Sequence, residues 1–449
     1  MTVHTATPAR EIPCRGFVFS FSTPFLLLHK ITFAGILSIG GDHLKTKNFV
    51  LYLLCAFLLF SLSLPALAEG AGGAAAIAAP GEGNAAPGAG STISTAAFSG
   101  ELDCKSAILM DAATGTVLFE KNADEALPPA SVTKVMTLLL VMEALDAGQY
   151  TLSDMVTVSA HAASMGGSQV YLKEGETMSV EEMVKCVVIS SANDCAVALA
   201  EFTAGSEESF VEKMNARAAE LGLANTHFEN TNGLDDTVTN HKTSARDIAL
   251  MSAALIRHPT ILKYSGIWMD TIRDGAFGLT NTNRLVRFYP GCTGLKTGST
   301  AKAGFCVSAT AERDGLSLIC VIMGSASRDN RNAAATKLLD FGFANYSAYT
   351  AGGGEKRLPV ICGEKEAVTV RYNAFSGLVP KGGAGKVEVR ADLPEKLTAP
   401  IVKGACVGEI TYIYEGNEIG SVGVFAEESV AKLTFGSLFC RLLAGFFGI

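Results

Sequence analysis

The sequence PPASVTK at residues 128–134 leads directly into the apolar run VMTLLLVM at residues 135–142. Proline is favoured at the start of a helix, and a helix that is apolar on nearly every side is a buried one. We therefore predict a buried helix with Ser131 and Lys134 in its first turn. Residues three apart share a helix face, so the hydroxyl and the amine would lie side by side. An unpaired buried lysine is costly, which indicates a functional role for the pair.

A second polar segment interrupts another apolar helix. The sequence SVEE at residues 179–182 is a capping box that opens a helix over residues 183–189. The helix resumes at residue 195, after a short polar break. Polar groups this close to a core need hydrogen-bond partners, so Ser191 and Asn193 are candidate site residues. A plain interhelix turn with Asp194 as the N-cap would also explain the break.

The third segment is GCTGLKTGST at residues 291–300. We predict a strand over residues 295–300, beside a hairpin of strands at residues 304–310 and 316–323. Gly298 removes a side chain at a point where another backbone or a ligand could approach closely. Lys296 taken alone would most simply be a solvated lysine, so its significance depends on the other two segments.

Together these segments form an ordered set: S-x-x-K at 131–134, S-x-N at 191–193 and K-T-G at 296–298. The set resembles the signature of the penicillin-recognising serine enzymes, which are the penicillin-binding proteins and serine β-lactamases. Within that superfamily the chain resembles low-molecular-mass D-alanyl-D-alanine carboxypeptidases over about residues 103–345. Supporting segments are NTNGLD at 230–235, TSARD at 243–247 and KLLDFGF at 337–343.

The residues themselves indicate the chemistry. Serine is a poor nucleophile without a base, so Ser131 needs Lys134 in its neutral form. Burial and the second cation, Lys296, would both favour that neutral form. We expect Ser191 to pass a proton between Lys134 and the leaving group, and Asn193 to bind the substrate amide.

The resemblance implies further roles. Lys296 with the Thr297 hydroxyl would bind the terminal carboxylate of the substrate. The oxyanion would be held by the backbone N–H groups of Ser131 and Ser299. Arg331 stands where the family places an arginine near the carboxylate site. The candidate substrate-binding residues are Lys296, Thr297, Gly298, Ser299 and Arg331.

The predicted fold class is α+β. Residues 101–348 are expected to form a β-lactamase/transpeptidase-like catalytic domain, an antiparallel sheet with flanking helices and a helical subdomain. Residues 355–426 contain short alternating segments such as AVTV at 367–370 and EITYIY at 409–414, which predict a small all-β domain.

The chain ends carry targeting signals. Residues 44–68 have the basic start, apolar middle and small-residue end of a signal peptide, with a membrane-spanning anchor as the alternative. Residues 1–43 are then a mis-annotated extension, and the Gly/Ala/Pro-rich residues 69–100 a disordered linker. Residues 429–449 predict an amphipathic helix in the membrane plane, or one packed on the β domain. An exported protein at the extracytoplasmic face of the membrane is expected.

Composition limits the choices. A net charge of −8 over 449 residues argues against a nucleic-acid partner. Cys186, Cys306 and Cys320 lie inside apolar runs, and none of the eleven cysteines forms a C-x-x-C pair, so most are interpreted as small buried hydrophobes. His227 and His241 lack metal-ligand spacing and are taken as structural, and we predict neither metal nor cofactor.

The predicted function is removal of the terminal D-alanine from peptidoglycan stem pentapeptides through a Ser131 acyl-enzyme, with covalent binding of β-lactam antibiotics. A serine β-lactamase is one alternative, but the Glu-x-x-x-Asn motif of class A enzymes is missing between the second and third segments. The other alternative is a catalytically silent cell-wall-binding scaffold. Such a scaffold has no need of the complete set of polar residues.

Overall fold

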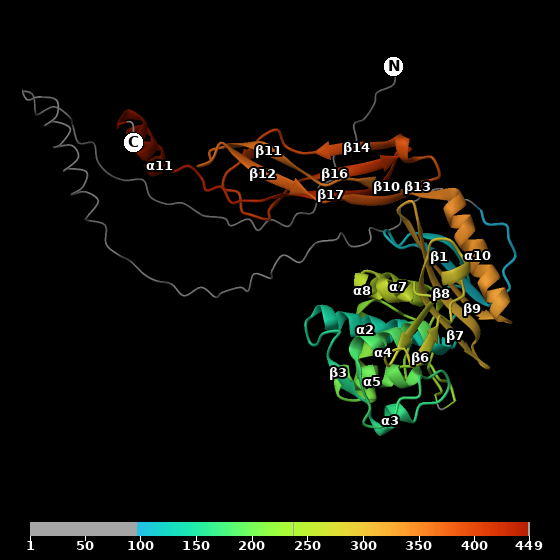
Figure 1. Cartoon of the computed structure of the whole chain (residues 1–449). Coiled ribbons are helices and arrows are strands. Elements are labelled where there is room, and N and C mark those ends of the chain that lie inside the picture. The colour runs from blue at the N-terminus through green and yellow to red at the C-terminus, as the bar shows by residue number, and fades with distance from the viewer. Residues whose placement is uncertain (1–96, 237, 448–449) are drawn as a thin grey trace, which may run out of the picture. The chain divides into compact units, whose positions relative to one another are not determined.

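The computed structural model of the chain describes residues 97–236 and 238–447 (Figure 1). The predicted N-terminal extension and signal peptide lie outside these residues, as does most of the predicted linker. The last linker residues are described, and they correct the prediction. The ring of Phe98 packs edge-on against Phe119 and Phe341, with centroids 5.0 and 5.4 Å apart. An aromatic side chain that can be buried in this way joins the fold.

The region from residue 97 to α10 (Arg328–Asn345) is built on a five-stranded sheet in the order β2-β1-β9-β8-β7. Every neighbouring pair is antiparallel. The prediction of a strand beside a later hairpin is therefore confirmed by β7, β8 and β9. The strands are β1 Ser106–Asp111, β2 Val117–Lys121, β7 Cys292–Thr300, β8 Gly304–Arg313 and β9 Leu316–Ser325.

Helices cover both faces of this sheet. Successive strand residues point to opposite faces, and on β1 Ile108 and Met110 join one apolar core while Ala107 and Leu109 join another. The second core includes α10 (Arg328–Asn345), and the first includes α2 (Lys134–Asp146) and α7 (Ala245–Ile256). Figure 1 shows α10 and α7 on opposite sides of the sheet. This arrangement explains why β1 is buried along its whole length.

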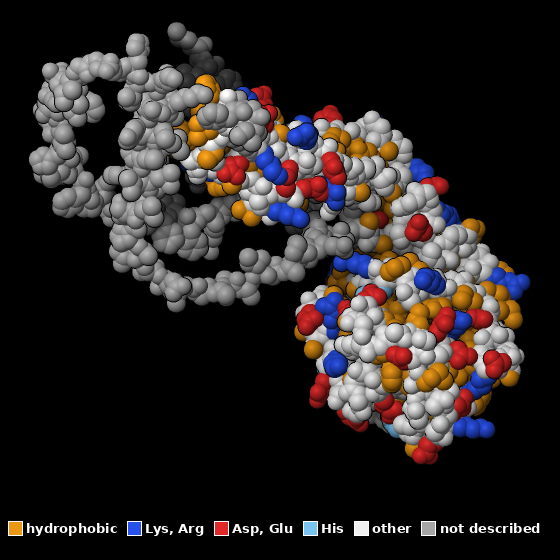
Figure 2. Space-filling model, turned by 60° about the vertical axis from the view of Figure 1, so that its left-hand side comes forward, with side chains coloured by type: hydrophobic (Ala, Val, Ile, Leu, Met, Phe, Trp, Pro, Cys, Tyr) orange, Lys and Arg blue, Asp and Glu red, His pale blue; other side chains and the backbone are white. Residues whose placement is uncertain are grey.

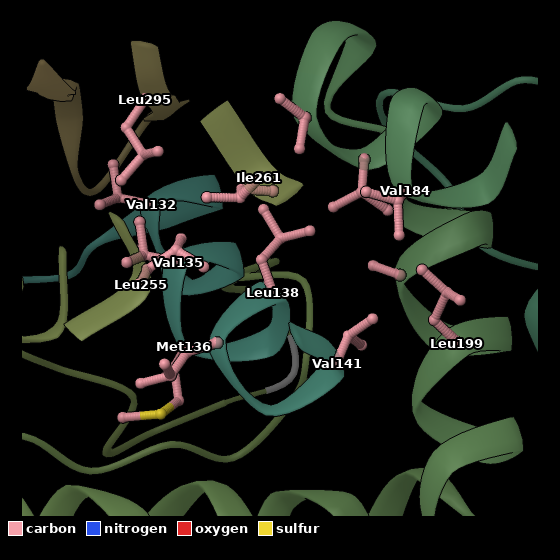
Figure 3. Close-up of a cluster of buried hydrophobic side chains, with 14 of the residues drawn as sticks. Val132, Val135, Met136, Leu138, Val141, Val184, Leu199, Leu255, Ile261 and Leu295 are labelled. Atoms are coloured by element: carbon pink, nitrogen blue, oxygen red, sulfur yellow. The ribbon is translucent and has the colours of Figure 1, made fainter. Parts of the chain in front are cut away.

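The helix α2 is buried on all sides, as the apolar run predicts. Figure 3 shows Val135, Leu138 and Val141 of α2 among side chains of the surrounding elements, including Val184 and Leu199. The partners come from the helical subdomain and from the helices next to the sheet. These elements are α4 Val180–Lys185, the π-helical turn η2 Cys186–Ser190, α5 Asn193–Ala204, α6 Glu207–Glu220 and α8 Pro259–Ser265.

The start of α2 differs from the prediction. Ser131 lies in a separate 3-10 turn, η1 (Ala130–Thr133), and α2 begins only at Lys134. Ala130 has a φ of +50°, in the left-handed region, so the α-helix cannot extend back through it. Ser131 and Lys134 remain three residues apart on one continuous turn of chain.

The remaining elements of this region are short. The hairpins β3–β4 and β5–β6 lie beside the helices, and α9 leads into β7. Their bounds are β3 Met155–Thr157, α3 Ala160–Ala163, β4 Thr177–Ser179, β5 Met269–Ile272, β6 Phe277–Thr280 and α9 Leu285–Phe288.

The C-terminal region is a small all-β domain, as predicted. Six strands form a sheet in the order β14-β16-β17-β12-β11-β15, and β10 pairs with β13. Glu415 and Gly416, with φ of +47° and +84°, form the tight turn between β16 and β17. The strands are β10 Tyr346–Ala351, β11 Gly354–Ile361, β12 Ala367–Tyr372, β13 Phe375–Pro380, β14 Val387–Asp392, β15 Leu397–Thr398, β16 Cys406–Tyr414 and β17 Asn417–Ala426.

The C-terminal helix is shorter than predicted. The helix α11 spans Phe435–Phe447, whereas Val430 pairs with Ile401 through two backbone hydrogen bonds. Residues 429–434 are thus excluded from the helix because they extend the β domain. Within the described residues, no helix has both the length and the apolar character needed to cross a membrane.

Cysteines and surface charges follow the composition. Nine of the cysteines fall within the described residues, where none forms a disulfide, and five of these are buried. These five fit the interpretation as small buried hydrophobes, whereas Cys362, Cys406 and Cys440 are exposed. On the face shown in Figure 2, acidic and basic side chains are interspersed. That face lacks the basic stripe typical of nucleic-acid-binding proteins.

Candidate active site

The first motif forms a hydrogen-bonded pair. Lys134 Nζ lies 2.9 Å from Ser131 Oγ, and it also lies 2.6 Å from Asn193 Oδ1 and 2.7 Å from the backbone oxygen of Asn232. Lys134 is fully buried, whereas Ser131 is partly exposed. A hydroxyl that solvent can reach therefore lies against an amine that solvent cannot reach.

The surroundings of Lys134 disfavour its charge. Burial lowers the pKa of Lys134 well below its usual range, and the positive charge of Lys296 lowers it further. The Asp194 carboxylate acts in the opposite direction but is the smallest of the three effects. The neutral amine that a base requires therefore forms at a lower pH than in an ordinary lysine, as the sequence predicted.

The second motif follows a π-helical turn, a feature frequent at functional sites. Ser191 has a left-handed φ of +64° and accepts a hydrogen bond from Lys296 Nζ at 2.9 Å. Asn193 donates from Nδ2 to the Gly166 oxygen at 2.7 Å. Ser191 therefore contacts the lysine of the third motif, whereas the sequence-based relay placed it against Lys134.

Asp194 is not the N-cap of α5, because Ala192 takes that position. Its buried carboxylate instead accepts hydrogen bonds from the backbone N–H groups of Val170, Leu172 and Cys195, at 3.0, 3.1 and 2.9 Å. These bonds tie the segment after α3 to the start of α5. The alternative explanation of the break as a simple cap is thus wrong.

The third motif lies on β7, directly against the turn that carries Ser131. Lys296 Nζ is fully buried, and burial together with the charge of Arg331 lowers its pKa to about 7. Thr297 Oγ1 donates to Thr282 Oγ1 at 2.8 Å. A Cβ on Gly298 would lie 2.8 Å from Ser131 N. Glycine is required here because two backbones approach closely, as the sequence predicted.

The other two candidate residues occupy different positions. Ser299 follows Gly298 on β7 and is exposed. Arg331 lies on α10, buried, and donates to the oxygen of Cys306, the residue opposite Gly298 on β8. The guanidinium thus contacts β8, the strand next to β7. Its charge lowers the pKa of Lys296, and its other hydrogen bonds go to Asn332 Oδ1.

Sequence reasoning missed two contributions to this site. The Asn232 oxygen that accepts from Lys134 is a backbone group, which leaves no side-chain pattern to detect. His241 was taken as structural, but its Nε2 lies 2.7 Å from Thr133 Oγ1 inside the first motif. The sequence signal for the Asn232 contact is the polar loop NTNGLD at residues 230–235, which resembles the family but belongs to none of the three motifs.

The sheet with helices on both faces and the Ser–Lys pair on the helical turn define a penicillin-recognising serine enzyme. A family model described as D-alanyl-D-alanine carboxypeptidase matches residues 92–327. A second, described as the C-terminal domain of penicillin-binding protein 5, matches residues 337–432. The chain belongs to the serine-type D-alanyl-D-alanine carboxypeptidase family.

Individual relatives agree with this assignment. D-alanyl-D-alanine carboxypeptidase DacF of Bacillus subtilis (strain 168) is 42% identical over 341 residues, which cover 74% of this chain and 87% of that protein. DacC of Escherichia coli (strain K12) is 37% identical over 347 residues, covering 74% and 85%. A crystal structure of penicillin binding protein 5 from Haemophilus influenzae is 32% identical with a TM-score of 0.65, covering 75% of this chain and 100% of that one.

Proposed function

We propose that this chain removes the terminal D-alanine from peptidoglycan stem pentapeptides through an acyl-enzyme on Ser131, and that β-lactams acylate the same hydroxyl. The observation that carries the proposal is the 2.9 Å contact between Ser131 Oγ and the buried amine of Lys134. The membership of the family supports the substrate class.

The neighbours of Lys134 suit its neutral form. A neutral amine has two N–H donors and one lone pair. The Asn193 and Asn232 oxygens can accept the two donors, which leaves the lone pair for the Ser131 hydroxyl. Lys134 would then take the hydroxyl proton as Ser131 Oγ attacks the carbonyl carbon of the D-Ala–D-Ala bond. The oxyanion would accept hydrogen bonds from the backbone N–H groups of Ser131 and Ser299.

The remaining steps need a proton for the leaving group and a water molecule. The proton taken up by Lys134 would pass to the Ser191 hydroxyl as Ser191 gives its own proton to the departing amine of D-alanine, so that Lys134 becomes neutral again; Ser191 accepts a hydrogen bond from Lys296 Nζ. The C–N bond breaks and the acyl group stays on Ser131 as an ester. Water would then attack the ester carbonyl as neutral Lys134 accepts a proton from it; the ester C–O bond breaks, and Lys134 returns the proton to Ser131 Oγ, which regenerates both residues. The Lys296 amine and the Thr297 hydroxyl favour a substrate with a free terminal carboxylate, and the positive charge of the buried Arg331 would add to this preference.

Replacing Ser131 by alanine should abolish D-alanine release from a synthetic pentapeptide ending in D-Ala-D-Ala. The experiment measures free D-alanine over time for the wild type, Ser131→Ala and Ser153→Ala, which removes a hydroxyl from an exposed serine. The wild type and Ser153→Ala should release D-alanine at equal rates. Release by Ser131→Ala at the wild-type rate would refute the proposal, and absence of release by all three would favour a silent scaffold.

We also propose that the protein is exported and that α11 lies on the membrane surface. The helix exposes a set of large apolar side chains that includes Phe435, Leu438, Phe439 and Leu442. An interfacial helix of this kind binds with its apolar face in the boundary between headgroups and acyl chains.

Truncation after Thr434 should remove binding to phospholipid vesicles and leave D-alanine release unchanged. The cut falls there because the backbone N–H of Leu433 still bonds to Cys362 in the β domain. Co-sedimentation with vesicles measures binding, and Leu438→Glu in the full chain is the matched variant. Equal sedimentation of the truncated and full-length chains would contradict the anchor.

A further inference from the structure

The turn that carries Ser131 is fixed by a chain of hydrogen bonds that begins at His241. Thr133 Oγ1 donates to the oxygen of Ala130 at 2.8 Å, and His241 Nε2 lies 2.7 Å from the same Oγ1. Thr133 is fully buried and His241 nearly so. These contacts connect the segment after α6 to the residue directly before Ser131.

The direction of the chain follows from the other ring nitrogen. His241 Nδ1 accepts the backbone N–H of Glu229 at 3.0 Å, so in the neutral ring the proton resides on Nε2. That N–H donates to Thr133 Oγ1, whose own proton then points to Ala130. Burial lowers the pKa of His241 to about 4, which keeps the ring neutral. The charged groups acting on it are Glu229, His227, Asp235 and Lys134.

The Ala130 oxygen matters because of the peptide unit to which it belongs. The carbonyl of Ala130 and the N–H of Ser131 are the two ends of one planar trans peptide. Fixing the oxygen on one side therefore fixes the direction of the Ser131 N–H on the other. Ala130 itself has a left-handed φ of +50°, a conformation that persists only when its surroundings enforce it.

The backbone of Gly233 packs against the same carbonyl. A Cβ placed on Gly233 would lie 1.9 Å from the Ala130 oxygen, so the loop backbone packs directly against it. Gly233 lies next to Asn232, whose oxygen accepts from Lys134. The loop thus contacts Lys134 at one end of the Ser-x-x-Lys motif and Ala130 directly before its other end, while His241 lies within hydrogen-bond distance of Thr133 between them.

We propose that His241 is a positioning residue, which aims the Ser131 N–H at the developing oxyanion through Thr133 and the Ala130 carbonyl. The inference rests on the proposed acylation of Ser131. It extends that proposal by assigning a role to a histidine that touches neither the substrate nor the reacting atoms.

The test compares two amides at the same position. In His241→Gln the side-chain amide nitrogen can occupy the place of Nε2 and donate to Thr133, whereas in His241→Asn the amide reaches only the place of Nδ1, next to Glu229 N. We expect Gln to keep kcat for D-alanine release within about threefold and Asn to lower it on the order of tenfold to 100-fold, with KM nearly unchanged, because the oxyanion forms only in the transition state.

A second pair removes any dependence on how the histidine variants fold. Thr133→Ser keeps the bridging hydroxyl and should retain activity, whereas Thr133→Val has the same shape without it and should lose activity as His241→Asn does. Thermal unfolding of each variant reports on the fold. The inference is overturned if His241→Asn matches the wild type in kcat, if Gln and Asn fall equally, or if only KM changes. A wild type that never acylates would instead defeat the underlying function.

Discussion

Replacing Lys134 by methionine should lower the rate of acylation by a fluorescent penicillin about 100-fold to 10,000-fold, the range expected for loss of a general base. Methionine fills similar space without an amine, so Ser131 Oγ loses the partner that now lies at 2.9 Å. The fold should persist because the change removes a buried group whose charge is costly. The matched control is Lys173→Met, which alters an exposed lysine and should label at the wild-type rate.

The pH dependence of the wild type gives a second readout of the same base. Burial and Lys296 lower the pKa of Lys134, so the neutral amine is present above that lowered pKa and is lost as the pH falls through it. Acylation should therefore reach its plateau well below the pH at which an ordinary lysine deprotonates. A rate that rises only near the pKa of an exposed lysine would contradict the assignment, as would normal labelling of Lys134→Met.

Replacing Gly298 by alanine should lower the acylation rate on the order of 100-fold, the effect of displacing a reacting group by about 1 Å. The added Cβ would lie 2.8 Å from both Pro129 O and Ser131 N, and 2.9 Å from Val132 N. These are backbone atoms, so the turn η1 must move away from β7. The labelling rate with fluorescent penicillin measures the effect.

The control for this substitution is Gly278→Ala on β6, where an added Cβ meets no atom within 4 Å. That variant should label as the wild type does, which separates the close approach from the general cost of removing a strand glycine. Equal labelling by Gly298→Ala and the wild type would show that the contact between β7 and η1 does not set the position of Ser131.

Periodicity and capping made much of the fold predictable. The capping box at Ser179 forms as expected, with Ser179 Oγ accepting the N–H of Glu182. The all-apolar run after Lys134 is a buried helix, and the turn at Asp314 and Gly315 joins β8 to β9. These features depend on residues close together in the sequence, which is why local patterns were sufficient to find them.

The parts that could not be predicted depend on distant backbone groups. The left-handed conformation of Ala130 is held in part by the distant Gly233, whose backbone packs against the Ala130 oxygen, and this contact leaves no local signal in the sequence. Two of the three backbone N–H groups that bond to Asp194, those of Val170 and Leu172, lie more than 20 residues away in the sequence. The contact between Ser191 and Lys296 likewise depends on their distance in three dimensions, which their spacing along the chain does not reveal.

The most direct test of the central claim is mass spectrometry of the intact protein after brief incubation with benzylpenicillin, followed by peptide mapping. The account predicts a mass increase of one penicillin per chain, located on the peptide that contains Ser131 and lost in Ser131→Ala. An adduct on any other residue, or none on a folded wild type that the pentapeptide assay finds inactive, would contradict the assignment of Ser131 as the nucleophile.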